Sequence, residues 1–145
     1  MKTILKLTGL IIVLQLGACK DDNELSPQVK NVSMLTATSW GNGTVIHAID
    51  GDLSGQYTDF VINFSKNPSA DFEGTYLVAN GGYAFPETTG KWKFSEDLTK
   101  IIFDSGREFD FQLDENHLQL DFVVTLAGGR ANGISGHFVF DLNPL

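Results

Sequence analysis

Apolar and polar residues alternate with a period of two along most of the chain after Trp40. The clearest run covers residues 108–113, where Phe, Phe and Leu alternate with acidic and amide residues. Such alternation indicates strands with one buried and one solvated face, as in antiparallel sheets. Eight strands are predicted, at residues 44–49, 59–65, 72–78, 90–95, 100–104, 108–113, 117–124 and 135–142.

The segments between these strands are short. Residues 95–98, 104–107 and 114–116 are rich in turn-forming residues, and 128–133 is a longer, glycine-rich connection. No segment is long enough for a crossover helix, so parallel pairing is not expected. The predicted fold is all-β, an eight-stranded antiparallel up-and-down barrel, because closure removes the exposed edges of such a sheet. A two-sheet sandwich is the alternative, although it usually needs longer connections.

The part of the chain before the strands predicts a short helical turn. Val32 and Leu35, within residues 29–36, are spaced to share one face of it.

The barrel interior is predicted to be crowded with aromatic side chains. Eight strands enclose a space that side chains just fill, or that holds one small ligand. A packed core is therefore one interpretation, and a pocket at one mouth, near Tyr57, Tyr83 and Phe85, is the other. The inward positions are Phe60, Ile62, Phe64, Trp92, Phe94, Ile101, Phe103, Phe109, Phe111, Leu118, Leu120, Phe122, Phe138 and Phe140.

The loop at residues 80–86 is the predicted recognition element. It places Tyr83 and Phe85 among glycines, where two exposed rings could stack on a sugar ring or a partner. The alternative is that both rings fold over the barrel end and cover the core.

The first residues have the pattern of an export signal. Lys2 and Lys6 precede an apolar run at 7–16 that is shorter than the roughly 20 residues of a membrane-spanning helix. The run ends in Leu16-Gly17-Ala18-Cys19, which resembles the bacterial lipobox. The resemblance implies cleavage before Cys19, diacylation of its sulfur and acylation, for example with palmitate, of its new amine. A plain secretory signal followed by an ordinary thiol is the alternative.

A charged run follows Cys19 directly. Residues 20–24, Lys-Asp-Asp-Asn-Glu, resemble the lipoprotein export signal of Bacteroidota, which sends lipoproteins to the outer face of the outer membrane. The alternative is a solvated linker. The expected organisation is a lipoprotein signal peptide at 1–18, a lipidated cysteine and flexible tether at 19–28, and a barrel domain at 29–145.

Several strand and turn segments of the barrel domain resemble a known family. They are residues 54–60, 74–76, 90–94, 118–122 and 136–140, which are similar to the small lipocalin-like domains of Bacteroidota lipoproteins. The resemblance covers about residues 29–145 and rests on turn and core positions. It implies a lipocalin-like or calycin-like barrel, and it implies nothing about chemistry.

Charge and cysteine content narrow the possible partners. The chain has 10 Lys and Arg against 18 Asp and Glu, a net charge of -8, so no nucleic acid is expected as a partner. Loss of Lys2 and Lys6 with the signal peptide leaves 8 basic residues and a net charge of -10. Acyl chains would therefore have to hold the protein on the membrane. The single cysteine cannot form an intrachain disulfide.

Candidate catalytic and metal-binding patterns are weak. Residues 50–55 match the first half of a calcium loop, but position twelve is Val61 and not the bidentate Glu. His117 and His137 fall about six residues out of register if Phe138 lies opposite Phe122. Asp110, Asp121 and Asp141 take outward positions, where solvated acids are commoner than paired catalytic ones.

No enzymatic activity, cofactor or metal is therefore expected. The leading hypothesis is a non-catalytic, surface-anchored outer-membrane lipoprotein that acts as an interaction or accessory module for other outer-membrane proteins. The second is a small-ligand-binding protein for an apolar or glycan ligand. A hollow interior favours the second hypothesis, and a filled barrel favours the first.

Overall fold

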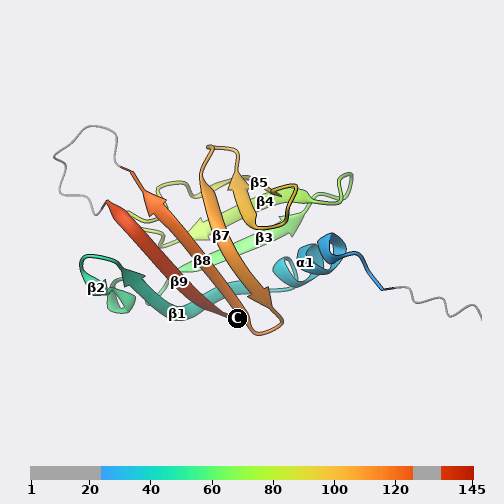
Figure 1. Cartoon of the computed structure of the whole chain (residues 1–145). Coiled ribbons are helices and arrows are strands. Elements are labelled where there is room, and N and C mark those ends of the chain that lie inside the picture. Colours follow the sequence, from blue (N-terminus) through green and yellow to red (C-terminus); the bar gives the residue numbers. More distant parts are fainter. Residues whose placement is uncertain (1–23, 126–134) are drawn as a thin grey trace, which may run out of the picture.

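The computed structural model describes residues 24–125 and 135–145. Within them, eight antiparallel strands follow one another around a closed barrel, and the pairing of the first with the last completes it (Figure 1). The barrel strands are β1 (Ser39–His47), β3 (Val61–Lys66), β4 (Glu73–Ala79), β5 (Thr89–Phe94), β6 (Lys100–Phe103), β7 (Glu108–Asp114), β8 (His117–Val124) and β9 (Gly136–Pro144). The predicted up-and-down barrel is confirmed, and the β1–β9 pairing excludes a two-sheet sandwich.

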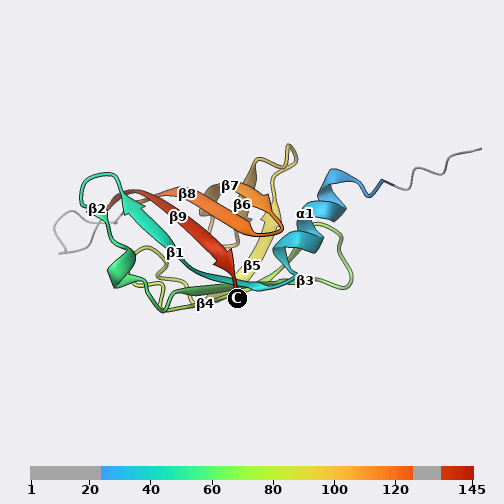
Figure 2. The same cartoon turned by 90° about the horizontal axis from the view of Figure 1, so that it is seen from below.

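The connections alternate between two ends of the barrel. The nine-residue helix α1 (Pro27–Leu35) leads into β1 at one end, which we call the helix end. The helix end also carries the C-terminus and the turns β3–β4, β5–β6 and β7–β8. The opposite end, which we call the pocket end, carries the short strand β2 (Gly51–Asp52), the 3-10 turn η1 (Ser54–Gln56), the β4–β5 loop and the β6–β7 turn. Figure 2 shows β1 and β9 running side by side between the two ends.

Helix α1 covers the helix end of the barrel. Ser26 caps it by accepting a hydrogen bond from the backbone N–H of Val29, and Pro27 occupies its first turn. The helix therefore includes Pro27 and Gln28, which the sequence assigned to the tether. Leu35 is fully buried, and its carbonyl accepts a hydrogen bond from Trp40 Nε1 at 3.0 Å.

Strand β1 starts five residues earlier than predicted because a bulge interrupts its alternation. The pairing of β1 with β9 shifts between Gly41 and Thr44. A Cβ on Gly43 would lie only 1.7 Å from the carbonyl oxygen of Asp141, so the close approach of the two strands requires glycine there. The apolar pattern is therefore lost where the chain closes the barrel.

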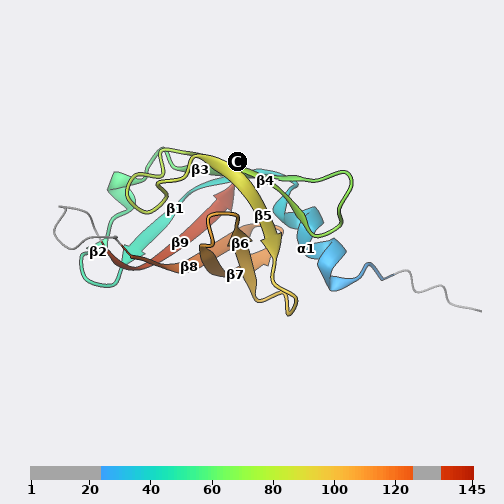
Figure 3. The ribbon, with the colours of Figure 1, turned by 90° about the horizontal axis from the view of Figure 1, so that it is seen from above.

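The register assumed for β8 and β9 is the one observed, and the predicted inward residues belong to the core. Phe138 lies opposite Phe122, and His137 lies opposite Val123. Every predicted inward residue is buried except Phe111, which is partly buried and stacks on Phe94 at 5.2 Å. Seen from above, β5 curves around the barrel between β4 and β6 (Figure 3).

The predicted signal peptide, Cys19 and the glycine-rich connection at 128–133 lie outside the described residues. Within the described ranges, no helix combines the length and apolar character of a membrane span.

Replacing Trp92 tests the inward register of β5. Trp92 is 1% exposed, its Nε1 donates to the carbonyl of Ser65 at 3.3 Å, and Lys91 and Lys93 on either side are exposed. We expect Trp92→Ala to lower the free energy of unfolding by about 3–5 kcal/mol, from lost packing and the cavity left behind. Urea denaturation measures this, with Lys93→Ala as the matched control, which should change stability by less than about 0.5 kcal/mol. Equal effects of the two substitutions would contradict the register.

Candidate functional site

The β4–β5 loop turns back into the barrel and does not present both of its aromatic rings to solvent. Asn80 and Gly82 adopt left-handed backbone conformations, each with φ of 55°. A Cβ on Gly81 would lie 2.5 Å from Cβ of Phe85, so this tight turn needs glycine. The Phe85 amide donates to the Gly81 carbonyl at 3.0 Å, which completes the turn.

Phe85 is a core residue, and the expectation that it is exposed is wrong. It is 2% exposed, and the loop's turn inserts it among four aromatic rings of the barrel. The ring centroids of Phe85 and its neighbours lie 5.0–5.5 Å apart; the neighbours are Phe60, Phe109, Phe122 and Phe140. Sequence alone could not distinguish an inserted ring from an exposed one, because both need a glycine-rich loop.

The other two predicted binding residues lie at the same end. Tyr57 is buried beneath the loop, with its ring 5.1 Å from that of Phe140, and burial raises its pKa. Tyr83 is 58% exposed. The structure therefore brings Tyr57, Tyr83 and Phe85 together, but only Tyr83 can offer its ring at the surface. A binding role for these residues stays a prediction.

Arg107, in the β6–β7 turn, covers the aromatic core at the pocket end. Its guanidinium carbon lies 5.0–5.3 Å from the ring centroids of Phe85, Phe109 and Phe122. Such cation–π contacts stabilise by about 0.5–2 kcal/mol as they become desolvated. Nη1 donates to Glu87 Oε2 at 2.6 Å, and Nη2 donates to the Ala84 carbonyl at 2.7 Å. Arg107 thus ties the β4–β5 loop to the β6–β7 turn.

The partner carboxylate, Glu87, is held in its ionised form. Burial acts to raise its pKa, but hydrogen bonds from its own backbone N–H, Arg107 and Ser105, together with the charge of Arg107, lower it more. The net effect is a Glu87 pKa below the ordinary value. A carboxylate whose pKa is lower in the folded state than in the unfolded state stabilises the fold at pH values above its unfolded-state pKa. The stability that Glu87 contributes is therefore lost as the pH falls through its folded-state pKa.

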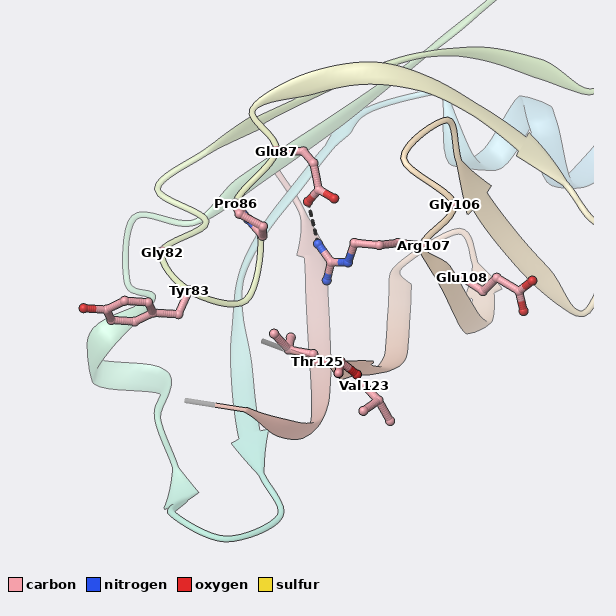
Figure 4. Close-up of a pocket in the computed structure, with 10 residues that line it drawn as sticks. Gly82, Tyr83, Pro86, Glu87, Gly106, Arg107, Glu108, Val123 and Thr125 are labelled. Atoms are coloured by element: carbon pink, nitrogen blue, oxygen red, sulfur yellow. Dashed lines mark hydrogen bonds and ion pairs between the residues drawn. The ribbon is translucent and has the colours of Figure 1, made fainter. Parts of the chain in front are cut away.

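A pocket of about 550 Å³ opens beside this ion pair (Figure 4). That volume lies in the range typical of small-molecule sites. Figure 4 shows the guanidinium of Arg107 directed toward Glu87 and the side chain of Tyr83 projecting outward at the rim. The lining residues are Gly82, Tyr83, Pro86, Glu87, Gly106, Arg107, Glu108, Val123, Val124 and Thr125.

Sequence inspection missed Arg107 and Glu87 as site residues. The period-two pattern did carry a signal for Arg107, because it has the same parity as the inward residues Phe109 and Phe111. Glu87 lies in an irregular loop, where no periodicity applies.

The described histidines each pair with one aspartate. The two outward histidines of β8 and β9 each contact an aspartate: His117 contacts Asp141, and His137 contacts Asp121. In the part of the chain that the structure describes, no group of three or more His, Cys, Asp or Glu could hold a metal ion. In the former calcium-loop candidate, the Asp52 carboxylate accepts hydrogen bonds from Ser54. These contacts account for the side chains as structural pairs and turn residues.

Alkaline titration tests the environment of Tyr76, whose ring stacks on Phe103 at 3.7 Å. Burial, then the negative charges of Glu87 and Asp104, raise the pKa of Tyr76 to about 12, although Arg107 acts in the opposite direction. The unfolded chain loses this proton near pH 10, so stability should be fully present below about pH 10 and fall as the pH rises toward 12. Unfolding free energies measured across this range should fall less steeply for Tyr76→Phe, and identical slopes would contradict the assignment.

Comparison of the sequence with models of known protein families gives no match. Comparison with curated proteins gives no significant match either.

Proposed function

We propose that this protein is a non-catalytic binding module, held on the outside of the outer membrane by acyl chains on Cys19, and that its pocket end meets the partner. The observation that carries the proposal is the contrast between the two parts of the barrel. The interior is filled by aromatic side chains, whereas the pocket end has a cavity of about 550 Å³ and the exposed ring of Tyr83. A rigid, filled barrel suits a scaffold that presents one end.

The anchor rests on the sequence. Cys19 follows a short apolar run in a lipobox-like context, and the chain's only cysteine falls at the position that acylation needs. Burying acyl chains contributes about 0.8 kcal/mol per CH2, so several chains anchor a protein stably. The acidic chain cannot attach to an anionic membrane surface by charge, so acyl chains are needed to anchor it.

The topology supports presentation of the pocket end away from the membrane. The chain enters the barrel through α1, which begins at Pro27 at the helix end. Residues 20–26, between the anchor and α1, reach about 25 Å when fully extended. The pocket end lies at the opposite end of the barrel strands and would therefore face outward to partners.

A non-catalytic role fits the chemistry of the pocket. Its partly buried charged groups, Arg107 and Glu87, neutralise each other at 2.6 Å. Neither is paired with a nucleophile among the lining residues, and an ion pair of this kind positions surfaces and ligands more readily than it transfers protons.

Binding of a small ligand is the second candidate function, and the volume of the pocket favours it. The partner could therefore be an outer-membrane protein or a small molecule, and both would use the pocket end. The accessory-module proposal is the broader of the two, because it does not fix the chemical class of the partner.

Replacing Cys19 tests the anchor. We expect Cys19→Ala to give an uncleaved or soluble species, because the thioether that carries the acyl chains cannot form. Detergent-phase partitioning and the mass of the processed chain measure this. Ser26→Ala, outside the lipobox-like motif, is the control and should remain acylated. A Cys19→Ala protein that is processed normally and stays in the detergent phase would overturn the anchor.

Replacing Tyr83 tests the pocket end as the binding surface. Affinity purification of the lipidated protein from its own outer membrane should lose its co-purifying components with Tyr83→Ala. Phe72→Ala is the matched control, since Phe72 is an aromatic residue with comparable exposure, 45%, at the helix end. Thermal melting should be unchanged for both variants. Retention of every component by Tyr83→Ala, or equal losses with Phe72→Ala, would contradict this surface.

A further inference from the structure

We infer that the pocket beside Arg107 binds a neutral, hydroxyl-rich ligand, a saccharide in chemical class. The inference rests on the proposed function, because it assigns a ligand class to the same pocket. The pocket's depth, its charges and its remaining hydrogen-bonding groups each exclude another class of ligand.

The depth of the pocket excludes a long apolar chain. The rings of Phe85, Phe109 and Phe122 lie directly beneath the Arg107 guanidinium and are buried in the core. None of the three lines the pocket. The cavity therefore stops at the guanidinium and does not continue into the barrel, so an acyl chain finds no apolar channel there.

The charges of the lining exclude ions of both signs. Arg107 is the cation of the wall and pairs with Glu87, whereas Glu108 pairs with Lys100 Nζ at 3.4 Å. An anionic ligand would compete with Glu87 for the guanidinium, in the field of a chain with a net charge of -8. A cationic ligand would meet the guanidinium, whose charge is permanent. A ligand without net charge avoids both penalties.

The hydrogen-bonding groups of the pocket that no other residue occupies suit a ligand with hydroxyl groups. A guanidinium has five N–H groups, and among the described residues that of Arg107 donates to Glu87 and Ala84 only. The hydroxyl of Thr125 can donate and accept. A sugar hydroxyl donates and accepts at once, so one ligand can satisfy all of these groups.

The apolar part of the lining fits the other face of a sugar ring. Pro86 and Val124 offer carbon surface beside the polar groups. Tyr83 projects outward at the rim (Figure 4), where its planar ring could contact a second unit of a longer saccharide. The pocket thus combines polar and apolar walls in the way that a sugar combines hydroxyl edges and C–H faces.

Sugars that differ only in charge test the inference on the whole lipidated chain in detergent. The neutral probes are glucose, galactose, mannose and N-acetylglucosamine. The charged probes are glucuronate and galacturonate as anions, and glucosamine and galactosamine as cations. Saturation-transfer NMR titrations measure the affinities. We expect at least one neutral sugar to bind, and each charged counterpart to bind at least about tenfold more weakly, a difference of about 1.4 kcal/mol.

Two glutamate variants test the cause of that selectivity. Glu108→Gln removes one anion of the pocket wall together with its ion pair to Lys100, and because its side chain is 53% exposed the fold should not change. It should strengthen uronate binding relative to that of the neutral sugar. Glu115→Gln, in the β7–β8 turn at the helix end, is the matched control and should change neither affinity.

The outcomes separate this inference from the proposed function. Charged sugars that bind as tightly as the neutral ones, or no binding by any neutral sugar, would overturn the neutral-ligand assignment. The co-purification experiment with Tyr83→Ala and Phe72→Ala decides the proposed function by itself, whatever the sugars do.

Discussion

Aromatic packing inside the closed eight-stranded barrel determines which surfaces of this protein are available for binding. Eight strands enclose little more space than their own inward side chains occupy, and here those side chains include both Trp and many Phe. Phe85 arrives from a loop and takes up further space among the rings of the strands. The barrel is therefore a solid scaffold, and the available surfaces are its ends and its outer face.

The two ends of the scaffold are closed by different chemistry. At the helix end, α1 buries Val32 and Leu35, and Trp40 donates to the Leu35 carbonyl. At the pocket end, a single guanidinium lies over three rings while its donors tie two connections together. A charged group at that boundary is stable because one side of it is apolar and the other is a solvated pocket. The same arrangement leaves donors near solvent, where a ligand could use them.

Backbone constraints make this arrangement possible at a few positions. Gly43 allows β1 and β9 to approach closely at the bulge, and Gly81 allows the β4–β5 loop to bring Phe85 into the core. A side chain at either site would collide with backbone or with Phe85 itself. Closure of the barrel and insertion of Phe85 therefore depend on residues that contribute no side-chain contacts of their own.

The sequence by itself determined the class of fold, the up-and-down order of the strands and much of the core that the strands bury. Period-two alternation carries that information because one face of each strand must be buried. The sequence also indicated the end of the barrel where the pocket lies, through the loop containing Tyr83. Only the tertiary structure decided that Phe85 points inward, that Arg107 pairs with Glu87 and that a pocket lies beside them. Those features depend on contacts between a loop, a turn and the end of a strand that are far apart in sequence, and no local pattern encodes such contacts.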